Sequence, residues 1–202
     1  MKLRFSPASP FVRKVTVVAL ETGLDARVER VPASVAPTKP NPDIQKDNPL
    51  AKVPALVLDN GETLYDSPVI CEYLDSLHGG AKMFPAAGAA RWTALRRQAL
   101  GDGILDAAVL TRYESIRPDP YKWQEWMDGQ MAKVQGALAA FEAEAGALGA
   151  TLDIGTITLG CALGYLDFRF ADLGWRKSFP KLAAWYEGFA ARPSMKATVP
   201  QG

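Results

Sequence analysis

The chain of 202 residues is long enough for one domain or two small ones, and 48% of its residues are hydrophobic. Charged residues make up 22% and the formal net charge is +1, which argues against a disordered chain and against a nucleic-acid partner. No apolar run reaches the roughly 18 to 20 residues that span a bilayer, and the first residues lack the pattern of a signal peptide. We therefore expect a cytoplasmic protein without membrane contacts.

The sequence holds two cysteines, Cys71 and Cys161, and a single histidine, His78. The cysteines lie far apart in helix-like patterns, so they form neither a CxxC redox pair nor a metal cluster. A zinc site is not expected with one histidine. We predict that both cysteines are buried as small apolar residues and that no metal is bound.

A strand–helix–strand pattern opens the chain. Residues 3–5 predict a short strand, and apolar side chains at helical spacing over residues 12–19 predict a helix that Gly23 ends. The stretch DARVERVPA then supplies a second strand. The proline-rich residues 35–49 predict a loop with at most one short helical turn, because proline fixes φ and lacks an N–H donor.

A hairpin and a helix follow. The stretch VPALVLDNGETLYDS predicts two strands joined at Asn60-Gly61, since these residues tolerate the positive φ of a tight turn. Ser67 as N-cap and Pro68 as first helical residue predict a helix that ends at Gly79. Together these elements predict an α+β first domain at residues 1–79.

The pattern then changes to long segments rich in Ala and Leu, with no further strand signal. Asp153 and Thr156 have the three-residue spacing of a capping box, which would serve folding. The change near residues 80–85 predicts a second, all-α domain at residues 86–202. Helices are predicted at about 88–116, 120–146, 153–171 and 180–191.

Four stretches, in this order along the chain, resemble the cytosolic glutathione S-transferases, and the match extends over nearly the whole sequence. They are SPFVRKV, NPLAKVPAL, YDSPVICEYLD and LDIGTITLGCALGYLDFR. The resemblance, to a bacterial, serine-type member, implies a thioredoxin-like N-terminal domain (βαβ, then ββα) that holds glutathione as co-substrate. It also implies an all-α C-terminal helical domain that shapes the electrophile pocket, and a homodimer.

Ser9 stands where the family places its thiol-activating hydroxyl. A free thiol has a pKa near 8.5, so lowering that pKa by two units needs roughly 2.7 kcal/mol of anion stabilisation. A hydroxyl donor and a helix N-terminus together can supply this amount. Spacing alone favours a helix cap at Ser9, followed by Pro10, and the two roles can coexist. Ser6 is the weaker candidate, because it lies at the end of the strand.

The resemblance also implies residues that bind the cysteinyl and glycyl parts of glutathione. Val53-Pro54 resembles the family's cis-proline turn, in which the backbone before the proline pairs with the cysteinyl part. Lys52 is the candidate for the glycyl carboxylate, and Lys39 is its rival. A solvated lysine is the alternative interpretation of Lys52.

Asp66 and Ser67 match the acidic-residue-then-serine signature for the γ-glutamyl end. The helix N-terminus and the Ser67 hydroxyl would face its carboxylate, and Asp66 would face its ammonium. N-capping is the alternative for Ser67, and the family more often has glutamate in place of Asp66. Asp102 and Asp106, one helical turn apart, could reach glutathione across a dimer interface or could simply be solvated.

The sequence thus predicts a detoxifying glutathione transferase in which Ser9 stabilises the thiolate for attack on a small hydrophobic electrophile. Phe11 and Tyr113 are the candidates for the electrophile pocket. Two alternatives stay open: a regulatory, glutathione S-transferase-like binding protein without turnover, and a glutathione-dependent peroxidase or isomerase.

Overall fold

In the computed structural model, which describes residues 1–202, the first part of the chain forms a four-stranded sheet. Its strand order is β2-β1-β3-β4. The central strand β1 (Lys2–Phe5) pairs parallel with β2 (Glu29–Pro32) and antiparallel with β3 (Ala55–Val57). The edge strand β4 (Thr63–Leu64) pairs antiparallel with β3. The predicted order of strands is confirmed.

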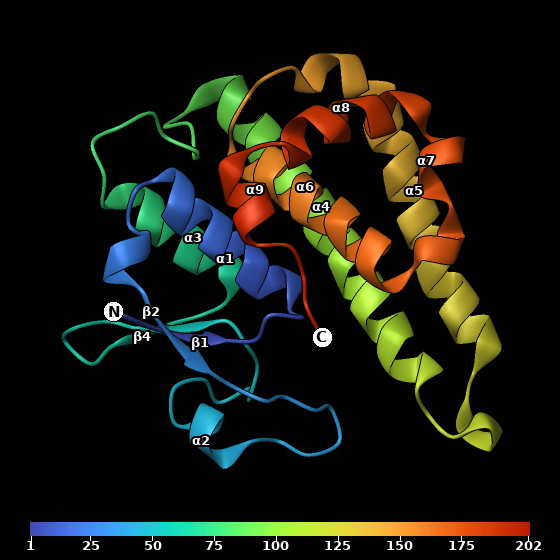
Figure 1. Ribbon diagram of the computed structural model, residues 1–202, viewed down its shortest axis with the longest axis horizontal. Coiled ribbons are helices and arrows are strands. Elements are labelled where there is room, and N and C mark those ends of the chain that lie inside the picture. The colour runs from blue at the N-terminus through green and yellow to red at the C-terminus, as the bar shows by residue number, and fades with distance from the viewer.

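Helices cover both faces of this sheet (Figure 1). Helices α1 (Pro10–Glu21) and α3 (Ser67–Ser76) lie on one face, and the short α2 (Pro42–Gln45) lies on the other. A 3-10 helix at Asp25–Arg27 connects α1 to β2. The single short helix in the proline-rich segment agrees with the prediction that proline excludes longer regular structure there. The thioredoxin-like arrangement of βαβ followed by ββα is therefore present.

No strand follows β4, and the rest of the chain is helical. The four predicted helices are present, with ends that differ by a few residues. Two short helices, α7 and α9, were not predicted from the sequence, because each is too short to show an apolar period. The helices of this part are α4 (Gly88–Ser115), α5 (Gln124–Leu148), α6 (Ile154–Arg169), α7 (Trp175–Ser178), α8 (Pro180–Ala190) and α9 (Pro193–Ala197).

Helix α6 is the centre of the helical part, and α4 lies directly against it. The predicted capping box begins α6: the Thr156 N–H donates to Asp153 Oδ1 at 2.8 Å, and the Asp153 N–H donates to the Thr156 hydroxyl at 3.0 Å. Two glycines permit the close approach of the helices. A Cβ at Gly101 would lie 2.8 Å from Thr158 Cγ2, and one at Gly155 would lie 2.6 Å from Arg97 Cβ. Larger residues at either position would push α4 and α6 apart.

One hydrophobic core extends through both parts of the molecule, from Leu3 in the sheet to Leu163 in α6. Cys71 and Cys161 belong to it and are fully buried, as predicted. Burial raises the pKa of the Cys161 thiol to about 11. Neither cysteine is therefore a ready thiolate.

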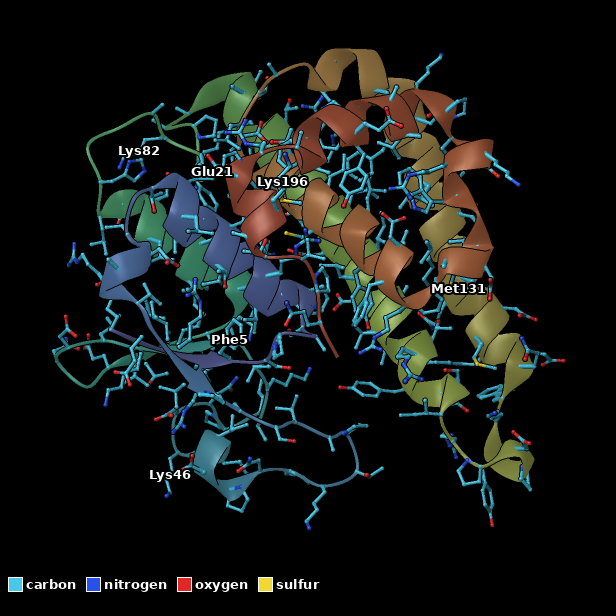
Figure 2. All side chains as sticks on the ribbon, in the orientation of Figure 1. Phe5, Glu21, Lys46, Lys82, Met131 and Lys196 are labelled. Carbon is cyan, nitrogen blue, oxygen red and sulfur yellow. The ribbon has the colours of Figure 1, made fainter.

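Polar contacts also join the two parts. At the end of α1, Glu21 accepts two 2.9 Å hydrogen bonds from Arg192, at the start of α9. Figure 2 shows Glu21 beside this helix, whose Lys196 is labelled. The Arg13 guanidinium donates to the Met195 carbonyl at 3.1 Å. These contacts hold α1 between the sheet and the last helices.

None of the helices has both the length and the apolar character needed to cross a lipid bilayer. No group of three or more His, Cys, Asp or Glu side chains is placed to hold a metal ion.

Candidate active site

A cavity of about 540 Å³ opens at the N-terminal end of α1. The first part of the chain forms one wall through the residues around Ser9 and the loop before Pro54. Helices α4 and α6 form the opposite wall. The cavity brings together five of the predicted site residues, namely Ser9, Phe11, Lys52, Val53 and Tyr113.

Ser9 is the N-cap residue of α1. Its backbone is extended (φ −82°, ψ 119°), and its hydroxyl oxygen accepts a 3.3 Å hydrogen bond from the Val12 N–H. Pro10 is the first helical residue, so the predicted cap is confirmed. The hydroxyl accepts this bond and donates none within the chain, which leaves its proton free for an acceptor in the cavity. Capping and donation to a sulfur anion therefore do not compete.

The Val53–Pro54 peptide bond is cis, as predicted. Neither the N–H nor the C=O of Val53 forms a hydrogen bond within the chain, so both are available to an extended peptide.

Asn48, which sequence reasoning missed, holds the loop before Val53 in place. It is 2% exposed, its side-chain amide donates to the Lys52 carbonyl at 3.0 Å, and its Oδ1 accepts from the Leu50 N–H at 3.0 Å. Its position before Pro49 was the available signal, because asparagine often bonds its neighbouring backbone in turns.

The start of α3 differs from the prediction by one residue. Asp66, not Ser67, is the N-cap, and Ser67 is the first helical residue. Ser67 was predicted as the cap because serine is a common N-cap and proline is common at the first helical position. In the structure Pro68 is the second helical residue, so the helix begins one residue earlier than predicted. No side chain bonds to the first-turn amides, since Asp66 makes no capping hydrogen bond. This end of α3 therefore keeps its capacity for an anion.

The Ser67 side chain is 1% exposed and its hydroxyl forms no hydrogen bond within the chain, while Asp66 is exposed. Neither residue belongs to the wall of the 540 Å³ cavity, and the same is true of Pro54. Pro54, Asp66 and Ser67 therefore lie outside this cavity, although Pro54 directly follows Val53, which borders it. A peptide ligand would have to extend from Ser9 over Val53 to reach Ser67.

Asp102 was expected either to reach glutathione across a dimer interface or to be solvated, and the structure shows a third environment. Its two carboxylate oxygens lie 2.6 and 2.8 Å from the Nζ of Lys14, which is fully buried. Asp102 is therefore paired within its own chain and not solvated. Burial raises the pKa of its carboxyl, and Lys14 opposes the rise. Burial also raises the pKa of the Asp106 carboxyl, whose surroundings include the charges of Lys52, Lys14 and Asp66.

Three further residues on the helical side of the cavity were not found from the sequence. Arg112 comes from α4, and Tyr165 and Arg169 come from α6. An arginine in the last turn of a helix is expected to complement the helix dipole. Nothing in the local sequence therefore marks Arg112 or Arg169 as cavity residues.

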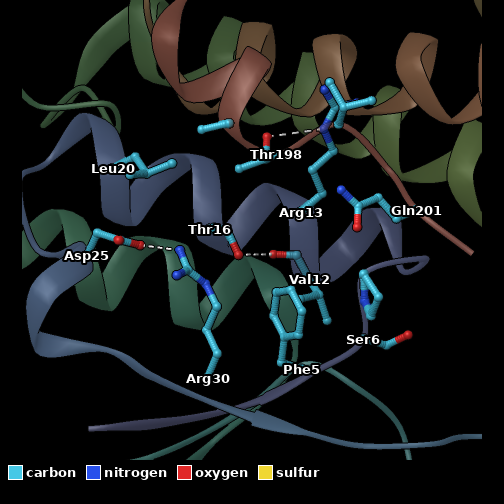
Figure 3. A pocket seen from close by; sticks show the side chains of 13 residues that line it. Phe5, Ser6, Val12, Arg13, Thr16, Leu20, Asp25, Arg30, Thr198 and Gln201 are labelled. Carbon is cyan, nitrogen blue, oxygen red and sulfur yellow. Dashed lines mark hydrogen bonds and ion pairs between the residues drawn. The ribbon is translucent and has the colours of Figure 1, made fainter.

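A second cavity, of about 490 Å³, lies along another face of α1 (Figure 3). Its wall includes Val12 and Thr16 of α1, Arg30 of β2 and Thr198 near the C-terminus. Of the residues predicted for the site, it is bordered by the weaker candidate Ser6 alone, and Ser6 also borders the cavity beside Ser9. The cavity beside Ser9 is therefore the candidate active site.

Two family models and a relative from Escherichia coli match this chain. Residues 8–77 match the family model of the glutathione S-transferase N-terminal domain, and residues 107–188 match that of the C-terminal domain. The chain is 33% identical over 203 residues to the "uncharacterized GST-like protein YibF" of Escherichia coli K12, covering 99% of this chain and 98% of that protein.

Two crystal structures of a glutathione transferase family member from Pseudomonas fluorescens Pf-5 are also similar. One, with bound glutathione, is 50% identical, covers 100% of this chain and 99% of that chain, and has a TM-score of 0.97. The other, with bound S-(propanoic acid)-glutathione, is 48% identical, covers 100% of both chains, and has a TM-score of 0.93. On this evidence the chain belongs to the glutathione S-transferase family.

Proposed function

We propose that this protein is a glutathione transferase that stabilises the glutathione thiolate through Ser9 and directs it at a small hydrophobic electrophile. The main support is the state of the Ser9 hydroxyl. Its oxygen caps α1 while its proton stays free, and it borders a cavity together with Val53 and Lys52. The glutathione bound to the Pseudomonas fluorescens relative supports the choice of thiol.

The tripeptide would bind in three places. The free N–H and C=O of Val53 would pair with the cysteinyl residue, next to the cis Pro54. The first turn of α3 and the Ser67 hydroxyl would bind the γ-glutamyl carboxylate, and Asp66 would bind the ammonium. Lys52 is proposed for the glycyl carboxylate, because it borders the same cavity. These contacts would place the sulfur at the start of α1.

Two effects would favour the thiolate there. The Ser9 hydroxyl donates a hydrogen bond to the anion, and the N-terminus of α1 has a partial positive charge. The second Pseudomonas structure holds a glutathione whose sulfur carries a propanoic acid group, so the site of that relative accommodates an S-conjugate.

Calorimetric titration with glutathione, followed by a thiol-consumption assay against a set of electrophiles, tests this proposal. Saturable binding and catalysed thiol consumption are expected. Saturable binding without any turnover would favour the regulatory alternative, and the absence of binding would contradict the proposal.

We also propose that the protein is a homodimer whose glutathione-binding domain spans residues 1–79 and whose helical domain spans residues 86–202. Large apolar side chains are exposed at Val69 of α3 (47%) and Trp92 of α4 (68%). Burial of such side chains against a second copy would stabilise a dimer. Sedimentation velocity measures the expected dimer, and a monomer at all concentrations would contradict it.

A further inference from the structure

The cavity beside Ser9 has an excess of positive charge. Its wall includes three cationic side chains, Lys52, Arg112 and Arg169, and no aspartate or glutamate. Unopposed cations around one cavity raise the local concentration of anions and stabilise an anionic ligand. Lys52 is assigned above to the glycyl end of glutathione. That assignment gives Arg112 and Arg169 no group of glutathione to bind.

No acidic side chain bonds either arginine. The side chain of Arg112, in the last turn of α4, forms no hydrogen bond or ion pair, and only its carbonyl accepts a bond from the Ser115 hydroxyl. Arg169 ends α6, and its side chain donates one 3.4 Å hydrogen bond, to the backbone oxygen of Gly202, the last residue of the sequence. Its guanidinium also lies 3.8 Å from the centre of the Phe168 ring. Neither guanidinium forms an ion pair with an aspartate or glutamate side chain.

The two charges act on the same region of the cavity wall. Tyr165 of α6 is 4% exposed and borders the same cavity as Arg112 and Arg169. Burial raises the pKa of its phenol, and the charges of Arg169 and Arg112 both oppose this rise. Both arginines therefore border the cavity near enough to Tyr165 for their charges to act on its phenol.

The other residues that border the cavity from α4 and its end are apolar or aromatic, namely Val109, Tyr113 and Ile116, and Phe11 of α1 also borders it. Such a surface fits a short hydrocarbon chain. The planar fork of a guanidinium can donate two parallel hydrogen bonds to the two oxygens of a carboxylate. The cavity wall therefore suits an apolar chain that ends in a carboxylate.

We propose, as a refinement that rests on the function proposed above, that the electrophile is a short α,β-unsaturated carboxylate whose carboxylate binds Arg112 and Arg169. Its alkene would then point toward the thiolate beside Ser9, because all three residues border one cavity.

The reaction is an addition. A lone pair of the thiolate forms the S–C bond at the β-carbon, the π pair of the alkene moves toward the α-carbon and the carboxylate, and the α-carbon takes a proton from water. No group leaves, and the proton gained at carbon balances the one lost from the thiol. A carboxylate alone makes an alkene a poor acceptor, since addition places a second negative charge on it. Two guanidinium groups would stabilise that charge as it develops.

Binding of two conjugates separates the role of the carboxylate from turnover. S-(2-carboxyethyl)glutathione and S-propylglutathione differ at the end of the S-alkyl chain, and their affinities can be measured by calorimetry. We expect the carboxylate conjugate to bind the wild type about ten- to a hundredfold more tightly. This preference should fall to a few-fold in Arg112→Gln and Arg169→Gln. Arg117→Gln is the matched control, because Arg117 bonds Glu114 and does not border the cavity.

Kinetics with but-2-enoate and its methyl ester provide the second arm, with each kcat/KM divided by the uncatalysed rate constant. The two arginine variants should lose about tenfold or more with the acid and less than about twofold with the ester. KM for glutathione should not change. Arg112→Lys should recover part of the loss, because it restores the charge without the planar fork.

Equal affinities of the two conjugates in the wild type, or equal losses with acid and ester, would overturn the assignment while leaving the transferase function intact. Absence of saturable glutathione binding would instead overturn the proposed function, and this inference with it. Near-ultraviolet circular dichroism of each variant shows whether it keeps the native fold.

Discussion

The Nζ of Lys14 in α1 lies 2.6 Å from one carboxylate oxygen of Asp102 in α4 and 2.8 Å from the other. The Lys14 side chain is fully buried and that of Asp102 is 17% exposed. This ion pair joins the sheet-covering helix α1 to the longest helix of the second part. Removal of either partner would leave an unpaired charge in the interior, next to the candidate site.

We predict that Lys14→Met lowers the free energy of unfolding by about 3 to 5 kcal/mol, because Asp102 would lose its partner. The double variant Lys14→Met/Asp102→Leu should lose much less than the sum of the two single variants. Chemical denaturation measures all of these values, with the exposed Lys177→Met as control. Additive losses would show that the pair does not couple the two helices.

The Glu21–Arg192 contact predicts a pH effect on stability. Hydrogen bonds from Arg192, and one from Ser194, lower the pKa of the Glu21 carboxyl below its ordinary value of 4.5. The stabilisation is therefore complete above pH 4.5 and is lost as the pH falls through the lower, folded-state pKa.

In Glu21→Gln the melting temperature should accordingly be lower at neutral pH and should fall less steeply below pH 4.5 than in the wild type. Glu187→Gln, at an exposed residue of α8, is the control. Parallel curves of melting temperature against pH for wild type and Glu21→Gln would contradict this prediction.

The uncapped start of α3 predicts the role of Ser67. Ser67→Ala should weaken glutathione binding about tenfold or more, since a hydrogen bond to a charged group would be lost. Binding of cysteinylglycine, which lacks the γ-glutamyl group, should not change. Ser76→Ala is the matched control, because this exposed serine of the same helix bonds the Tyr73 carbonyl. Equal losses for both ligands would place the γ-glutamyl group elsewhere.

Local signals in the sequence were sufficient for most of the fold. The order of strands and helices, the Ser9 cap and the Asp153–Thr156 capping box all depend on residues within a few positions of one another. The resemblance to a known family supplied the candidate site, including the cis Val53–Pro54 bond.

Long-range contacts were not predictable in the same way. Lys14 reads as an ordinary surface lysine, and its partner Asp102 is 88 residues further along the chain. Arg112 and Arg169 meet at one cavity only because α4 and α6 lie side by side. The roles of Lys14, Arg112 and Arg169 are recognised only from the fold, because no local sequence pattern distinguishes these residues from solvated ones.

The ultraviolet absorbance of enzyme-bound glutathione as a function of pH tests the central claim most directly, because it reports the thiolate itself. In the wild type the thiol pKa should lie about two units below its free value of roughly 8.5. In Ser9→Ala it should return toward that value while glutathione still binds, and Ser9→Thr and Ser6→Ala should stay close to the wild type. The same low thiol pKa in Ser9→Ala as in the wild type would contradict thiolate stabilisation by Ser9.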